Sequence, residues 1–287
     1  MHREPPPRSA STSCAAATAC LSLLLLPTGL GCAYHRAGAP VAVPAADLKE
    51  GPNLRFFPPP FALAAPEDAI VRIVGPQMNC SGTLVDDDLV LTAHHCVVQR
   101  KPNGDYTKDL NDPKEVHVEL GGDYLAWGHV QVSAIVAPPC GEAGGAGDVA
   151  VLVLQHKLVG LATLGVRLEG PPRIGEQLQP VGFGRCSMSS DGIRRQERPS
   201  GTVMATTGET IHLRASICPG DSGGPVLGRG GTEVVGVISM SAMDGDDRTT
   251  GPSVMARIDA YRSVLAHARL VADGSSLSEL PPLSCLP

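Results

Sequence analysis

The sequence predicts an all-β protein, and three observations lead to that prediction. Short apolar runs recur along the chain, and several of them alternate with polar residues as half-buried strands do. Turn-forming residues separate these runs, and the chain contains 33 glycines and 26 prolines. A length of 287 residues is sufficient for one large all-β domain or for two small ones.

The composition limits both the core and the partners. Apolar residues make up 43% of the chain and aromatic residues only 3%, so the core has to consist of Val, Leu, Ile and Ala. The net charge is −6, and the chain has neither a basic run nor an RNA-binding motif. We therefore expect no nucleic-acid partner.

The amino-terminal segment, residues 1–32, has the pattern of an export signal. Arg3 and Arg8 precede an apolar stretch centred on residues 21–26, which is too short to span a bilayer as a stable helix. Residues 33–60 are rich in Ala and Pro, bury little and are expected to form an extended linker.

The end of this signal, GLGC at residues 29–32, leaves two interpretations open. It resembles a bacterial lipoprotein signal, in which Cys32 receives lipid after cleavage and the protein stays in the cell envelope. Gly29 departs from that pattern, because an aliphatic residue is usual there. The other interpretation is ordinary secretion with cleavage nearby.

The cysteines fit an exported protein. Of nine cysteines, Cys14 and Cys20 would leave with the signal, and Cys32 is the candidate for lipidation. Six remain, an even number that suits three disulfides: Cys80, Cys96, Cys140, Cys186, Cys218 and Cys285.

The strands of the main domain, residues 61–270, are predicted from alternation, apolar runs and turn residues. The polar segments 100–114 and 187–200 are expected to be a surface loop and a mobile loop. Helical spacing of apolar residues predicts a helix at about 259–270, and residues 271–287 form a tail. The predicted strands lie at 69–74, 80–85, 89–94, 116–120, 129–136, 149–154, 181–184, 209–214, 233–241 and 252–255.

Three motifs supply the chemistry of a serine hydrolase. Residues 218–225 (CPGDSGGP) place Ser222 between glycines, where backbone N–H groups are free to bind a negative oxygen. A serine needs a base beside it, and residues 92–96 (TAHHC) offer one. Asp148 opens an apolar run, and a carboxylate at the mouth of a buried strand has to be hydrogen-bonded. The order His, Asp, Ser argues against an α/β-hydrolase, whose histidine comes last.

These motifs and their order resemble the trypsin-like serine endopeptidases of the chymotrypsin fold, over about residues 60–270. The resemblance implies two antiparallel six-stranded β-barrels with a C-terminal helix and an active site between the barrels. It implies that Ser222 is the nucleophile, His95 the base and Asp148 its orienting carboxylate. The N–H groups of Gly220 and Ser222 would form the oxyanion hole, and no cofactor is expected.

Two adjacent histidines require a choice between them. In the family, the catalytic histidine directly precedes the cysteine, which makes it His95, and His94 is expected to be structural. The resemblance also implies a Cys80–Cys96 disulfide that holds this loop. Two histidines with two cysteines suggest zinc as well. Adjacent histidines do not easily share one metal, however, and export favours disulfides, so no metal is expected.

The resemblance also assigns a substrate pocket. It places Ser216 at the base and Ser241 and Ser253 at the wall. The end of the strand at Ser239, Met240 and Ser241 would pair with the substrate as an added strand. Because Ser216 is not acidic and the wall serines narrow the space, we expect cleavage after small or medium uncharged residues.

Two departures from the family concern activation and the disulfides. Family zymogens are cut before an Ile-Val-Gly-Gly segment, whose new amino group pairs with the aspartate before the nucleophile; the Ile-Val-Gly of residues 73–75 lies too close to Cys80 to serve. The family partner of Cys218 is also missing. Four cysteines allow three connectivities, and the pairs we expect are Cys186–Cys218 and Cys140–Cys285.

A protein of another class is the alternative: a catalytically silent, protease-like binding protein of the cell envelope. Such proteins typically lose a residue of the triad, whereas all three are present here. For an active protease we expect a polypeptide substrate and a monomer, with membrane contact only through a lipid at Cys32.

Overall fold

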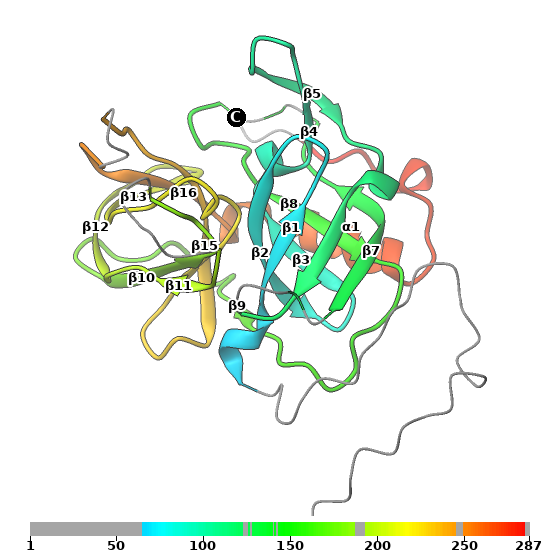
Figure 1. Cartoon of the computed structure of the whole chain (residues 1–287), viewed down its shortest axis with the longest axis horizontal. Helices are drawn as coiled ribbons and strands as arrows, with labels where there is room; N and C mark the ends of the chain where they lie inside the picture. Colours follow the sequence, from blue (N-terminus) through cyan, green and yellow to red (C-terminus); the bar gives the residue numbers. More distant parts are fainter. Residues whose placement is uncertain are drawn as a thin grey trace, which may run out of the picture. The chain divides into compact units, whose positions relative to one another are not determined.

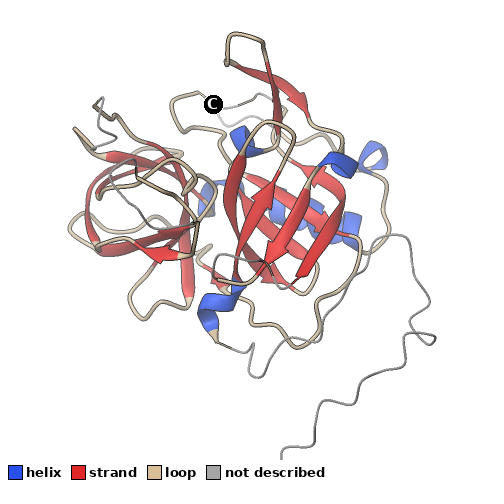
Figure 2. Cartoon of the chain, viewed as in Figure 1, coloured by secondary structure: helices blue, strands red, loops and turns tan. Residues whose placement is uncertain are grey.

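The computed structural model describes residues 65–284 apart from residues 123–125, 127, 140, 142, 187–192 and 245–248. The predicted signal and linker lie outside these residues, as do Cys32, Cys140 and Cys285. In the described part, strands joined by loops dominate, and α1 (Arg262–Ala272) is the one α-helix (Figures 1 and 2). None of its helices has the length and hydrophobicity needed to cross a membrane.

The first barrel is a closed ring of six antiparallel strands in the order β1-β2-β3-β8-β7-β6 (Figure 1). Antiparallel pairing of β1 with β6 closes the ring. Its strands are β1 (Ile70–Val74), β2 (Asn79–Asp86), β3 (Leu89–Thr92), β6 (His117–Leu120), β7 (Gly128–Val136) and β8 (Ala150–Leu154).

The second barrel also has six antiparallel strands, and the pairing of β10 with both β12 and β14 closes it. The short strands β9 (Gly165–Val166) and β11 (Gln196–Glu197) extend it beside β15 and β10. The prediction of two six-stranded barrels is thereby confirmed. The six strands are β10 (Gln177–Gly182), β12 (Gly201–Thr206), β13 (Thr210–Arg214), β14 (Pro225–Leu227), β15 (Glu233–Met240) and β16 (Ser253–Arg257).

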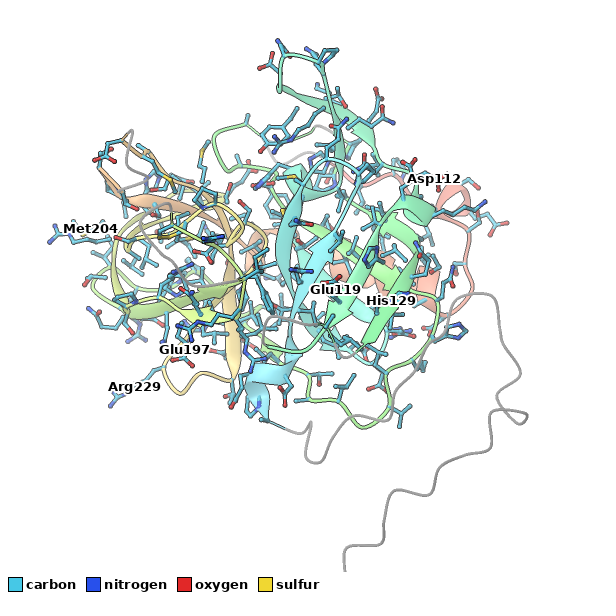
Figure 3. All side chains as sticks on the ribbon, viewed as in Figure 1. Asp112, Glu119, His129, Glu197, Met204 and Arg229 are labelled. Carbon is cyan, nitrogen blue, oxygen red and sulfur yellow. A yellow bond between two sulfur atoms is a disulfide. The ribbon has the colours of Figure 1, made fainter. Side chains whose placement is uncertain are left out.

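Aliphatic residues fill both barrels, as the composition predicts. All residues of β8 (AVLVL) are buried, because helix α1 packs against this strand. Strand β6 alternates between buried and half-buried residues, so its polar side chains lie on the outer face. Glu119 on β6 lies opposite His129 on β7 (Figure 3). His129 is exposed, and the half-buried His117 contacts it edge-on.

The C-terminal helix is confirmed, with a slightly later start than predicted. A 3-10 turn precedes α1, whose Val264 and Ala268 are buried against the first barrel. Arg269 in its last turn pairs with Asp86 and Asp88, in the region where β2 turns into β3. The 3-10 turns of the described chain are η1 (Pro66–Ala69), η2 (His94–Cys96), η3 (Pro113–Glu115), η4 (Asp259–Tyr261) and η5 (Leu277–Glu279).

The segment 100–114, predicted to be a surface loop, is instead largely a hairpin. Strands β4 (Val98–Arg100) and β5 (Tyr106–Leu110) pair with each other and extend beyond the first barrel (Figure 1). Pro102 and Gly104 lie in its turn, and the strands beside them are short and too polar to predict.

Candidate active site

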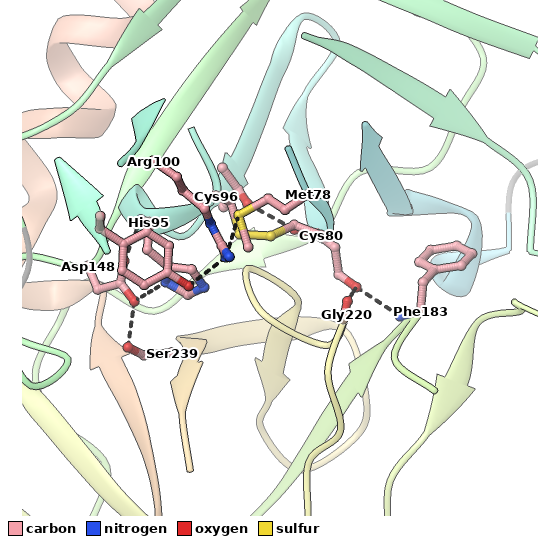
Figure 4. The surroundings of a disulfide bond; sticks show 12 residues. Met78, Cys80, His95, Cys96, Arg100, Asp148, Phe183, Gly220 and Ser239 are labelled. Atoms are coloured by element: carbon pink, nitrogen blue, oxygen red, sulfur yellow. Dashed lines mark hydrogen bonds and ion pairs between the residues drawn. A yellow bond between two sulfur atoms is a disulfide. The ribbon is translucent and has the colours of Figure 1, made fainter. Parts of the chain in front are cut away.

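His95 and Asp148 lie side by side at one end of the first barrel. His95 lies in the short turn η2 after β3, and Asp148 lies two residues before the start of β8, which pairs with β3. The His95 backbone N–H donates to Asp148 Oδ1 (2.9 Å), and His95 Nδ1–H donates to Asp148 Oδ2 (2.7 Å; Figure 4). Nδ1–H is hydrogen-bonded to the carboxylate. In the neutral ring, Nε2 therefore carries no proton and is the basic nitrogen.

The second barrel contributes a further donor to Asp148. Ser239 Oγ, near the end of β15, donates to Asp148 Oδ2 at 2.5 Å (Figure 4). Burial is the largest effect on the pKa of Asp148 and raises it. The charge of His95 and the hydrogen bonds from His95 and Ser239 outweigh burial, so the pKa of Asp148 lies below its usual value. The carboxylate is therefore ionised and able to stabilise a protonated His95.

The hairpin β4–β5 covers the other side of the histidine. The Tyr106 ring lies 5.3 Å from the His95 ring, centroid to centroid, at a tilt of 56°. The Arg100 guanidinium stacks on Tyr106, 4.6 Å from its centroid, and Nη2 donates to the Tyr106 hydroxyl. His95 is only 5% exposed as a result.

His94 takes a structural position, as the sequence predicts. It is 2% exposed, and burial lowers its pKa, so it stays neutral. The Cys80–Cys96 disulfide is present beside it, with an S–S distance of 2.03 Å. Both sulfurs lie close to His95, but sulfurs that are bonded to each other offer no thiolate to zinc.

The loop that carries Ser222 is held against the first barrel by Ser81 on β2. The Ser81 N–H donates to the Ser222 carbonyl oxygen (2.8 Å). Ser81 Oγ donates to the Gly220 carbonyl oxygen (2.8 Å) and accepts from the Phe183 N–H (2.8 Å). Ser81 is fully buried, so one residue of the first barrel fixes both ends of the 220–222 segment.

The nucleophile loop also packs against the chain that leads to His95. A Cβ added at Gly223 would lie 2.2 Å from Thr92 Oγ1 and 3.1 Å from the Ala93 nitrogen. Only glycine permits this approach, and its φ of +82° favours glycine as well. Ser222 itself is half-buried between the buried Asp221 and Gly223.

Two N–H groups of this loop point to an oxyanion hole. The N–H groups of Asp221, Gly223 and Gly224 all donate to backbone carbonyls. Those of Gly220 and Ser222, in contrast, donate to no acceptor in the part of the chain that the structure describes. Free N–H groups on both sides of Asp221 are the donors that a developing negative oxygen needs.

The carboxylate of Asp221 organises the same loop. It is fully buried and accepts from the Gly184 and Cys218 N–H groups. An added Cβ at Gly182 or Gly184 would lie 2.7 Å or 2.5 Å from its atoms. The glycines on either side of Phe183 thus make room for Asp221. Its remaining partner is Arg198, which the sequence analysis placed in a mobile loop but which is buried.

Of the predicted pocket residues, Ser253 and Ser241 contact each other, and Ser216 lines a hollow beside Ala215. Ser253 is fully buried; its hydroxyl donates to the Ala215 carbonyl oxygen (2.7 Å), and its Oγ lies at hydrogen-bond distance from Ser241 Oγ (3.1 Å). Ser216 is exposed and lines a hollow of about 250 Å³ together with Arg214. Within the described residues, this hollow holds no acidic side chain.

The second disulfide joins Cys186 to Cys218, the pair that the sequence analysis preferred. It ties the chain after β10 to the first residue of the nucleophile loop. The pairing of Cys140 with Cys285 falls outside the described residues and stays a prediction.

Known proteins share this fold and sequence pattern. The sequence matches the model of the trypsin family over residues 65–265. Cercarial protease of Schistosoma mansoni is 30% identical over 185 residues, covering 56% of this chain and 69% of that protein. Among solved structures, a Glu endopeptidase in complex with MPD has 19% identity and a TM-score of 0.58, covering 76% of this chain and 95% of that chain. Neuropsin, a serine protease expressed in the limbic system of mouse brain, has 18% identity and a TM-score of 0.54, covering 71% and 95%.

The two barrels and their site define the class as the chymotrypsin-fold serine proteases. With the match over residues 65–265, the chain belongs to the trypsin family of serine endopeptidases. Motifs in the sequence located His95, Asp148 and the loop of Ser222. Ser81 and Arg198 were missed, because a buried serine and a buried arginine have no local signature.

Replacing Ser81 by Ala should weaken the nucleophile loop. The change leaves the Phe183 N–H and the Gly220 carbonyl without their partner, and an unsatisfied buried group costs about 1–3 kcal/mol. We expect a lower free energy of unfolding and a lower kcat. Denaturant unfolding and peptide-ester kinetics measure both. Ser133→Ala, which removes a hydroxyl on the far side of the barrel, is the control; an equal loss in that variant would contradict the role of Ser81.

The lowered pKa of Asp148 predicts how stability depends on pH. A carboxyl group whose pKa is lower in the folded state stabilises the fold above its unfolded pKa, about 3.9, and this stabilisation is lost as pH falls through the folded value. Asp148→Asn should therefore be less stable than the wild type at pH 7, and the difference should shrink below about pH 4. Urea unfolding at a series of pH values measures it. Asp109→Asn, on the exposed hairpin, serves as the control, and a difference that grows toward acid pH would contradict the prediction.

Proposed function

We propose that the chain cleaves peptide bonds with Ser222 as nucleophile, His95 as general base and Asp148 as the carboxylate that orients His95. The observation that carries this proposal is the buried His95–Asp148 pair beside a loop whose Gly220 and Ser222 N–H groups lack acceptors in the described chain. This set matches the requirements for acyl transfer: a nucleophile, an oriented base and oxyanion donors.

The reaction follows from these positions in two halves. Ser222 Oγ attacks the scissile carbonyl carbon while His95 Nε2 takes the hydroxyl proton. The carbonyl oxygen becomes negative and binds the N–H groups of Gly220 and Ser222; the C–N bond then breaks as Nε2 gives its proton to the leaving amine. Water attacks the acyl-enzyme ester in the same way, with Nε2 as the base, and frees Ser222.

The ionised Asp148 serves both halves. It holds Nδ1–H, so that Nε2 is the basic nitrogen, and it stabilises the imidazolium that forms twice per cycle. Ser239 keeps this carboxylate bonded from the second barrel. The silent binding protein has no observation in its favour, because no member of the triad is missing.

The wider context of the protease is also a proposal. Two disulfides fit an exported protein, which supports the interpretation of residues 1–32 as a signal, with Cys32 as the candidate lipid site. Residues 33–60 would link the protease domain, 61–270, to that point, and 271–287 would be a tail. We propose a monomer that acts on polypeptides, needs no cofactor and touches the membrane only through this lipid.

We also propose a preference for small or medium uncharged residues before the cut. The Ser253 side chain bridges Ala215 and Ser241 and so fills space that an open pocket would leave empty. Arg214 also lines the hollow at Ser216, and the described residues of this hollow offer no carboxylate to a cationic side chain. Binding of Arg or Lys there would cost desolvation without an ion pair in return.

Triad variants test the mechanism. Ser222→Ala, His95→Ala and Asp148→Ala should each lower kcat by roughly 10⁴–10⁶-fold, because triad members act as one unit. His94→Ala should change kcat only slightly. Peptide-ester turnover and labelling with a serine-directed phosphonate provide the two measurements, with Ser222→Ala as the unlabelled control. Loss of turnover in His94→Ala with retention in His95→Ala would show that the assignment of the base is wrong.

A peptide library varied only at the residue before the cut tests the pocket. Cleavage after Ala or Val should exceed cleavage after Arg or Lys by at least about tenfold in kcat/KM, which is roughly 1.4 kcal/mol in the barrier. Because Arg214 lines the hollow, the library includes Glu. A clear preference for Arg or Lys would overturn the proposal and would point to an acidic side chain such as Asp244, or to Asp246 outside the described residues.

A further inference from the structure

The aspartate before the nucleophile has every acceptor position filled from within the chain. Oδ1 of Asp221 accepts from the Gly184 N–H (2.8 Å) and from Arg198 Nη2 (3.0 Å). Oδ2 accepts from the Cys218 N–H (2.8 Å) and from Arg198 Nε (2.7 Å). A carboxylate has about four acceptor sites, so this fully buried group has no site left for another donor.

Arg198 is itself fixed by more than its carboxylate partner. It follows β11 and is 9% exposed. Nη2 also donates to the Gly184 carbonyl oxygen (2.6 Å), and Nη1 donates to Gln196 Oε1 (2.8 Å). The planar guanidinium of Arg198 therefore donates to both carboxylate oxygens of Asp221. The single ammonium of lysine does not reproduce this geometry.

The position of Asp221 determines the direction in which the N–H groups of Gly220 and Ser222 point. Gly220 and Ser222 are its direct neighbours, and Gly220 has a φ of +99°, which holds the chain in a conformation that glycine alone adopts easily. The Arg185 N–H bonds the Pro219 carbonyl oxygen (2.9 Å), so the same strand end that carries Gly184 also holds the loop's first turn. A displaced Asp221 carboxylate would turn both N–H groups away.

We propose that Arg198 is the positioning residue of the oxyanion hole: its guanidinium holds Asp221 from within the chain, and no amino group released by chain cleavage is needed. This inference rests on the proposed function, since the N–H groups matter only if an oxyanion forms there. Residues 73–75 agree with it. Ile73 and Val74 are paired on both sides, with β2 and with β6, and so are not available as a new chain end.

Kinetics of Arg198 variants test the proposal in the full chain. Arg198→Met removes the charge and the fork but keeps an unbranched apolar stem. We expect kcat to fall about 100-fold, with KM within threefold, because oxyanion donors act in the transition state. The matched control is Arg257→Met, which breaks the ion pair between the half-buried Arg257 of β16 and the buried Asp259; its kcat should stay within threefold of the wild type.

Rescue separates positioning from mere stability. Added guanidinium, at a concentration that leaves the wild type unchanged, should raise the kcat of Arg198→Ala at least about tenfold and should not raise that of His95→Ala. Near-UV circular dichroism shows whether the Met and Ala variants fold. If they do not, Arg198→Lys becomes the variant that tests the positioning role. It should fold and lose about tenfold in kcat. A folded Arg198→Met with wild-type kcat, a loss only in KM, or an Arg198→Lys with wild-type kcat would overturn the proposal.

Phosphonate labelling of the wild type distinguishes this inference from the proposed function. Intact-mass analysis should find the label on Ser222 in chains that are uncut between residues 33 and 80. Label confined to chains cut in that range would overturn the role of Arg198 and leave the proposed function intact. No label at Ser222 in folded wild type would overturn the proposed function, and this inference with it.

Discussion

Burial of the Asp148 carboxylate is the constraint on which the site depends. An unpaired buried charge is costly, so this group has to find donors wherever the chain can supply them. His95 supplies two from the first barrel, and Ser239 supplies one from the second. Since the last donor reaches Asp148 only when the barrels are docked, the orientation of the base and the docking of the barrels stabilise each other.

Asp221 imposes the same constraint on the second barrel, with different consequences for the sequence. Its carboxylate lies where any side chain at Gly182 or Gly184 would collide with it, so glycine at both positions follows from close approach. The sequence predicted only a strand over residues 181–184. The structure gives the physical reason for the two glycines, and the N–H of Phe183 between them donates to Ser81 Oγ.

The sequence predicted what local patterns encode. Alternation located β6 and β7 nearly residue by residue, whereas β12 and β14 of the second barrel have no counterpart among the predicted strands. Motifs located His95, Asp148 and Ser222. Arg198 and Ser81 act over sequence separations of 23 and 139 residues, and nothing in their neighbours distinguishes them from solvated polar residues. The hairpin with Tyr106 was missed because its strands are polar on both faces.

The two buried aspartates therefore have opposite tasks, and their partners differ accordingly. Asp148 faces His95, which in the proposed reaction has to gain and lose a proton in each half. Asp221 faces a guanidinium, which keeps its charge over the pH range of proteins, because the loop it holds has to stay in place while protons move. An arginine at position 198 thus separates the part of the site that titrates from the part that must stay fixed. A released amino group loses its proton in mildly alkaline solution, so its hold on Asp221 would itself depend on pH.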